Sequence, residues 1–251
     1  MKISKLAVLV LLAVFIISLI VLAPARLIYR FLPENSPVQL SNLSGSIWRG
    51  NAQQVIYQNL NLGNQDWRLK PTALLTAKLG SSFTLRHPDY QAEGNLKAGS
   101  DNLLILNDTT VKISADRIPL EGIASAVKAN GVVNADIDSL TLRDQKIDQI
   151  QARINWKNAS ISAPVELQLG EVIIDAEGED GTINAVIKSS ANSQLDIDGK
   201  VELDPAMQYR ADIKIKSKPD TPAEVTNMLP LLGQKDSEGA VRLISNGVVP
   251  Q

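Results

Sequence analysis

The sequence predicts a mainly β protein, in which one N-terminal transmembrane helix is followed by an elongated, curved antiparallel β-sheet domain with two short helices. Two observations lead to this fold class. An uncharged apolar run occupies residues 6–23, and apolar and polar residues alternate with a period of two through much of the chain after residue 38. The first pattern is typical of a membrane-spanning helix, and the second is typical of strands with one apolar face.

The apolar run is long enough to cross a bilayer. It contains eighteen consecutive residues without a charge, and Ser18 is the one polar residue among them. As a helix the run is about 27 Å long, close to the roughly 30 Å of a bilayer's hydrocarbon core. A cleaved signal peptide is the alternative, because Ala23-Pro24-Ala25 has the small-x-small form of a cleavage site.

The flanking residues favour a helix that is retained. Arg26 and Arg30 follow the run like the basic residues of an interfacial belt, and Lys2 and Lys5 precede it. Basic residues before the first span place the N-terminus in the cytoplasm. We therefore expect a cytoplasmic tail at residues 1–5, a transmembrane helix at 6–25, a linker at 26–37 and a periplasmic β-domain at 38–251.

The composition fits a protein of the bacterial envelope. The chain has no cysteine, which excludes disulfides and thiolate metal sites. A secreted eukaryotic domain of this size would more often carry disulfides, so the periplasm is the favoured compartment. The 25 basic and 27 acidic residues are dispersed along the chain. This pattern has no electrostatic footprint for nucleic acid, so we expect no nucleic-acid partner.

Four lines of alternating residues are the clearest strand signals, at residues 150–156, 161–169, 195–203 and 209–215. Turn residues such as Lys157-Asn158 separate them. Connections of a few residues indicate antiparallel hairpins rather than βαβ crossovers. The alternation slips at Asp138-Ser139, which indicates a bulge or a tight turn.

Two segments have helical signals. One covers residues 120–128, and the other covers residues 221–232, with Pro222 in its first turn and Gly233 after its last. Two short helices are little material to cover a sheet of about fourteen strands. The apolar faces therefore form either a closed sandwich of two sheets or a groove along one curled sheet, and the pattern leaves both open.

No constellation of catalytic residues is present. His87 is the only histidine, and no cysteine exists to pair with it. Glu177, Glu179 and Asp180 cluster around glycines, but without the full acidic pattern of a calcium loop they indicate a solvated hairpin tip. An anchored hydrolase is disfavoured, because no nucleophile–base pair can be named. We expect no enzyme, no metal and no cofactor.

Three stretches carry more specific motifs. Val38 to Gly50 reads V-x-L-x-x-L-x-G-x-I-W-x-G, and Trp67 to Leu75 reads W-x-L-x-P-x-x-L-L. A third, near the C-terminus, is L-L-G followed by D-x-x-G. The motif residues that we single out, for which we expect structural roles, are Gly45, Trp48, Gly50, Trp67, Pro71, Trp156, Gly233 and Gly239.

These motifs, behind an N-terminal apolar run, resemble the N protein of the type II (general) secretion pathway almost end to end. The resemblance implies a bitopic component of the cell inner membrane that assists export of folded proteins across the outer membrane. Other secretion subunits and the inner membrane would be its partners. A more distant similarity to AsmA-like envelope proteins implies the alternative, a groove that binds or shields lipid.

Overall fold

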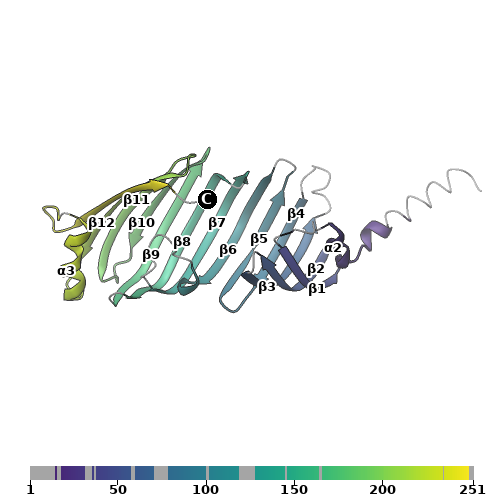
Figure 1. Ribbon diagram of the computed structural model, residues 1–251, viewed down its shortest axis with the longest axis horizontal. Helices are drawn as coiled ribbons and strands as arrows, with labels where there is room; N and C mark the ends of the chain where they lie inside the picture. The colour runs from purple at the N-terminus through teal and green to yellow at the C-terminus, as the bar shows by residue number, and fades with distance from the viewer. Residues whose placement is uncertain are drawn as a thin grey trace, which may run out of the picture. The chain divides into compact units, whose positions relative to one another are not determined.

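The computed structural model describes residues 15, 18–31, 36, 38–57, 60–70, 79–99, 102–118, 128–144, 146–163, 166–233 and 235–248. These residues are mainly β, with antiparallel strands and few short helices, as the sequence predicted. The chain divides into two compact units, residues 1–87 and 88–251. Within each unit the strands labelled in Figure 1 follow one another in chain order.

In the part of the first unit that the structure describes, there are four strands and a short helical segment. Its elements are η1 (Ala25–Leu27), α2 (Ile28–Phe31), β1 (Val38–Gly45), β2 (Arg49–Tyr57), β3 (Leu60–Lys70) and β4 (Leu79–Arg86). Its core consists of Ala25, Leu43, Ala52 and Val55, with Trp67 packed beside them. Because Ala25 is fully buried there, the helical segment is part of this unit's core.

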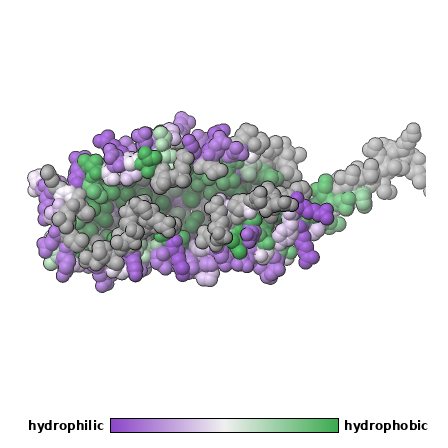
Figure 2. All heavy atoms as spheres, viewed as in Figure 1, coloured by the Kyte–Doolittle hydropathy of each residue, from purple (hydrophilic) through white to green (hydrophobic). Residues whose placement is uncertain are grey.

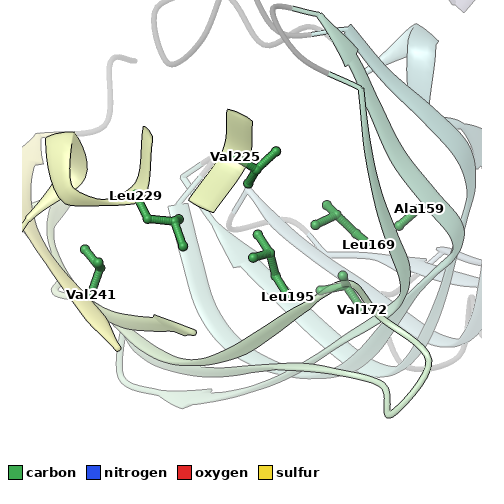
Figure 3. Packing of buried hydrophobic residues seen from close by; sticks show 7 residues of the cluster. All are labelled: Ala159, Leu169, Val172, Leu195, Val225, Leu229 and Val241. Atoms are coloured by element: carbon green, nitrogen blue, oxygen red, sulfur yellow. The ribbon is translucent and has the colours of Figure 1, made fainter. Parts of the chain in front are cut away.

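The described residues of the second unit form a nine-stranded antiparallel meander with one α-helix packed against it. Its strands are β5 (Tyr90–Ala98), β6 (Leu103–Ser114), β7 (Lys128–Arg143), β8 (Lys146–Ala163), β9 (Leu167–Glu179), β10 (Thr182–Ser189), β11 (Leu195–Leu203), β12 (Gln208–Ser217) and β13 (Val241–Val248). A short 3-10 turn, η3 (Ala115–Arg117), follows β6, and α3 (Ala223–Leu232) precedes β13. The strands curve around the side chains that α3 contacts (Figure 3).

The helix predicted over residues 221–232 is confirmed, and it begins directly after Pro222. Gly233 follows its last residue with an extended backbone, where a Cβ would lie 2.5 Å from the carbonyl oxygen of Arg242. The glycine therefore permits a close approach to β13. The other predicted helix, 120–128, falls outside the described residues except for Lys128, which begins β7.

The predicted strand over residues 161–169 is wrong. β8 runs through the predicted turn at Lys157-Asn158 and ends at Ala163, and β9 begins at Leu167. Ile161 and Leu167 pair across these two strands. Paired residues share a face, so the alternation continues through the connection and hides it. Asn158 takes a left-handed φ of 49° inside a bulge of β8, not in a turn.

Two smaller predictions are confirmed. The register of β7 against β8 shifts between Ile137 and Ser139, where the alternation slips. The acidic cluster around Glu179 is an exposed hairpin tip. There Asp180 and Gly181 both have positive φ, as a two-residue type I′ turn requires.

Of the transmembrane helix predicted at 6–25, residues 6–14 and 16–17 lie outside the described residues. Within the described part of the chain, no helix combines the length and hydropathy that a membrane crossing requires.

Candidate functional site

The first candidate site is the apolar face of the second unit's sheet. Strand register aligns apolar side chains from strand to strand, because paired residues point to the same side. One row crosses the strands β5 to β13 without a charge: Ala92, Val111, Ala135, Ile154, Ile174, Ile187, Gly199, Ile213 and Leu243. A strand spacing of about 4.8 Å makes this row about 38 Å long.

A second uncharged row runs parallel to the first, four positions along each strand except β6 and β7, where register shifts make the offset five. It contains Leu96, Leu106, Leu140, Ile150, Gly178, Ile183, Leu203, Tyr209 and Gly247. Figure 2 shows apolar residues gathered in a hollow of this unit between polar margins. The face therefore offers a long apolar surface rather than a single pocket.

Burial differs along this face. Under α3, the side chains of Leu195, Val172 and Val241 are buried, and Val225 and Leu229 of the helix point toward them (Figure 3). Further along, Ile154 and Ile174 are half-buried. Large core side chains in a closed protein lose nearly all contact with water. The middle of the face thus keeps part of its apolar area accessible among the described residues.

α3 is held in place by hydrogen bonds at both ends. Before it, Thr221 Oγ1 donates to the carbonyl of Gln194, and Lys218 Nζ donates to the carbonyl of Ala191 over 3.0 Å. After it, the carboxylate of Asp236 accepts from the backbone N–H groups of Glu238 and Ala240, each over 2.9 Å. These contacts fix the helix as a cover over the β9–β13 end of the apolar face.

The opposite face of the same sheet is charged. Arg153 donates to Asp175 over 2.6 Å, and Arg242 forms an ion pair with Asp212. The hydrogen bond from Arg242 holds the pKa of Asp212 below its usual range. Exposed pairs of this kind add little stability. They do mark this face as the one that water wets.

The second candidate site is the motif block of the first unit, where the structure brings Gly45, Gly50 and Trp67 together. Gly45 pairs with Gly50 in β1–β2, and Gly50 pairs with Trp67 in β2–β3. A Cβ on Gly50 would lie 2.3 Å from the Trp67 ring. Gly45 has a φ of +83°, which favours glycine. The two glycines make room for the turn and for the ring.

Trp48 lies in the turn between these strands and reaches the N-terminal segment. Its indole Nε1 donates to the carbonyl of Ile20 over 2.8 Å, and the backbone N–H of Ile47 donates to the carbonyl of Ala23 over 3.0 Å. Trp67 Nε1 donates in turn to the carbonyl of Ile47, also over 3.0 Å. The chain of three bonds ties residues 20–23 to β2 and β3.

The remaining motif residues lie elsewhere. Trp156 is half-buried on the apolar face of β8, and its Nε1 donates to the carbonyl of Asn130 over 2.9 Å. Gly239, with a φ of +77°, closes the turn that Asp236 caps. Gly233 lies against β13, and Pro71 is outside the described residues. The seven described motif residues thus form no single site.

Sequence reasoning missed one feature of the first unit, a cluster of arginines. Arg49 and Arg68 are paired across β2 and β3, and with Arg86 they line a surface pocket of about 450 Å³. Asn51 and Arg86 donate to Asp66 and hold the pKa of its carboxyl below the usual range, with the Asn51 bond the larger cause. The three arginines are far apart in sequence, so the register alone brings them together.

The described residues include no group of three or more histidine, aspartate and glutamate side chains placed to hold a metal ion.

These features define a class of protein built of antiparallel strands. The sheet of the second unit has one apolar and one charged face, and the first strands of the first unit are hydrogen-bonded to an apolar N-terminal segment. The family model of type II secretion system (T2SS) protein N matches residues 36–244. The chain belongs to that family, and it is a component of the type II secretion system.

Curated relatives extend over nearly the whole chain. The chain is 27% identical to the type II secretion system protein N of Aeromonas hydrophila, over 91% of this chain and 92% of the relative. It is 24% identical to that of Vibrio cholerae serotype O1, over 90% and 91%. The Klebsiella pneumoniae protein is 23% identical, over 93% and 91%. No solved structure matches the chain.

Proposed function

We propose that this chain is a bitopic inner-membrane subunit of the type II secretion system that acts by contact with other subunits. Residues 1–5 lie in the cytoplasm, residues 6–25 span the membrane, residues 26–37 link the span to the sheet, and residues 38–251 work in the periplasm. The eighteen uncharged residues at 6–23 support the span. The protein has no catalytic task in this proposal, and the motif residues have structural roles.

One observation carries the proposal that the N-terminal segment is retained. Ala25, the last residue of the apparent cleavage site, has no exposed area and packs in the core of the first unit. The carbonyl of Ala23 accepts a hydrogen bond from Ile47. Cleavage after Ala25 would remove the buried alanine and leave the Ile47 N–H without this partner. The folded unit thus uses the residues that a signal peptidase would discard.

The retained span has a direct test. N-terminal sequencing of the mature protein should find Met1 or Lys2, and carbonate extraction should leave the protein in the membrane fraction. A mature terminus at Arg26 would contradict the proposal.

Contact with other subunits is tested by affinity purification of the full chain from detergent-solubilised membranes, followed by mass spectrometry. Type II secretion subunits should copurify. The control is residues 1–37 fused to an unrelated periplasmic domain. Equal recovery of the subunits with this fusion would show that the β-domain makes no contact with them.

The half-buried apolar face favours a second candidate function, the binding or shielding of lipid. An acyl chain spans about 15 Å, half the hydrocarbon thickness of a bilayer. The apolar row across β5–β13 is about 38 Å long and has room for one. A phospholipid shielded there would cover the area that Ile154 and Ile174 leave accessible. The same purification, with mass spectrometry of lipids, should then recover phospholipid that the fusion control does not.

A further inference from the structure

We infer that the β1–β2 turn, with Trp48 at its tip and Arg49 and Arg68 beside it, is a membrane-contact surface that binds anionic phospholipid headgroups. The inference rests on the proposed membrane span. It adds to that span a second contact, made by a turn more than twenty residues further along the chain.

The β1–β2 turn is hydrogen-bonded to the end of the apolar segment. Trp48 Nε1 lies 2.8 Å from the carbonyl oxygen of Ile20, and Ile47 N lies 3.0 Å from that of Ala23. Both acceptors belong to the last turn of the apolar segment. If residues 6–25 span the bilayer, their periplasmic end lies at the membrane surface. The β1–β2 turn must then lie there too, because these two bonds leave no room for a separation.

An apolar surface surrounds this contact. Ile20 is 50% exposed and Leu22 is 76% exposed, with Leu19 and Val21 similarly open. Contiguous exposed apolar residues mark an interaction surface. Trp48 lies against this surface with its N–H bonded to a backbone carbonyl. Tryptophan is enriched at the membrane interface, where an amphipathic ring sits at headgroup level.

Two arginines give this surface a positive charge. Arg49 follows Trp48 directly and lies opposite Arg68 in the β2–β3 register. Like charges directly opposite each other destabilise a sheet. Asp66, the acidic residue nearest them, is already occupied by Asn51 and Arg86. Among the ion pairs of the described residues none includes Arg49 or Arg68, and Arg49 acts on Asp66 only through a smaller electrostatic attraction. Both arginines are exposed, so their guanidinium groups can reach an external anion.

Phospholipid phosphate is the anion that fits. Guanidinium groups bind phosphate oxygens in a bidentate geometry. The surface pocket between the arginines adds the hydroxyl-bearing residues Ser82 and Thr84 to its lining. Exposed Arg26 and Arg30 lie on the same short stretch that leaves the span. Basic residues next to a span are attracted to anionic lipid, so the surface should prefer anionic headgroups over zwitterionic ones.

The test uses the full chain reconstituted in vesicles, with tryptophan emission quenched by lipids brominated near the top of the acyl chain. Brominated lipid should quench part of the tryptophan emission of the wild type and of W156F. W48F should lack this quenched part, because it comes from Trp48. The inference would be overturned, and the span would still stand, if brominated lipid quenched wild type and W48F to the same extent and the protein resisted carbonate extraction. Release of the protein by carbonate would instead overturn the span on which the inference rests.

The headgroup preference is tested in the same assay. Brominated phosphatidylglycerol should quench Trp48 more strongly than brominated phosphatidylcholine at equal mole fraction, and added salt should reduce the difference. R49Q and R68Q should each reduce this preference. R210Q, which removes an exposed charge from the second unit, should leave it unchanged. Quenching of Trp48 that does not depend on the headgroup would overturn the assignment of the two arginines.

Discussion

The two tryptophans of the motif block have different contacts, although the sequence presents them alike. Trp67 packs over Gly50 inside the first unit, whereas Trp48 faces the N-terminal segment and donates to Ile20. The sequence supported the expectation that both hold the first strands together. It could not identify the carbonyl of Ile20 as a partner, because that bond joins residues 28 positions apart and leaves no trace in local pattern.

Replacement of Gly50 by alanine should destabilise the first unit by about 1–3 kcal/mol, the usual cost of overpacking. The new Cβ would lie 2.3 Å from the Trp67 ring and 2.7 Å from the carbonyl oxygen of Ser44. Thermal or urea unfolding measures the change. Gly99→Ala is the matched control, because its Cβ would meet its nearest neighbour at an ordinary 3.4 Å. Equal unfolding midpoints for the two variants would contradict the packing described for Trp67.

Asp66 should give the first unit a stability that depends on pH. Hydrogen bonds from Asn51 and Arg86 lower its pKa in the folded state. A lowered pKa means that the contribution is complete above the unfolded value of about 3.9 and is lost as the pH falls through the folded value. The melting temperature of wild type should exceed that of D66N at neutral pH, and the difference should shrink as the pH falls below the unfolded value. A gap that does not change with pH would contradict this assignment.

At the scale of elements, alternation identified which residues share a face but not where strands end. The alternating segments 195–203 and 209–215 correspond to β11 and β12, and their apolar residues lie on one side of the sheet. The line 161–169 was instead the end of β8 and the start of β9. An antiparallel pair keeps its apolar residues on one face across the connection, so a period of two cannot separate these cases. The bulge at Asn158 requires glycine at position 131 of the neighbouring strand, because a Cβ added there would lie 2.6 Å from the Asn158 carbonyl oxygen.

The cover formed by α3 should depend on Leu229, which is buried over the apolar face. Leu229→Ala should cost about 2–4 kcal/mol through lost burial and the cavity that remains. Asn227→Ala, on an exposed position of the same helix, is the control and should change stability by less than about 0.5 kcal/mol. Chemical denaturation measures both. A Leu229→Ala variant as stable as the control would show that α3 does not pack on the sheet.

Trp156 should contribute less to the free energy of unfolding than a fully buried tryptophan. Its ring is half-buried on the apolar face of β8 and its N–H is bonded to Asn130. Full burial would give a cost of about 3–5 kcal/mol for Trp156→Ala, so the half-buried ring should give about 2 kcal/mol. Trp156→Phe should lose about 1 kcal/mol with the hydrogen bond. Unfolding midpoints that match wild type in both variants would place this side chain in water.

At the scale of the molecule, the sequence predicted the β class and the family resemblance but not how the apolar face is used. A closed sandwich and an open groove give the same alternation, because both place apolar residues on one side. The difference lies in what covers that side. α3 covers the end near β13, and Ile154 and Ile174 beyond it are half-buried. The structure therefore favours a face that stays accessible in its middle.

The most direct test of this accessible face compares two neighbouring isoleucines. Ile174 lies on the apolar face and Ile173 on the charged one, where it pairs with Lys188, and both are half-buried. A carboxylate in a closed core would lack a partner and cost several kcal/mol. On an accessible face water would solvate it. Two quantities are measured for purified I174E and I173E: the melting temperature and the amount of phospholipid that copurifies with each variant. The account predicts two folded variants with similar melting temperatures, and loss of copurified phospholipid in I174E alone. Collapse of the I174E melt beside a stable I173E would contradict it and show a closed core.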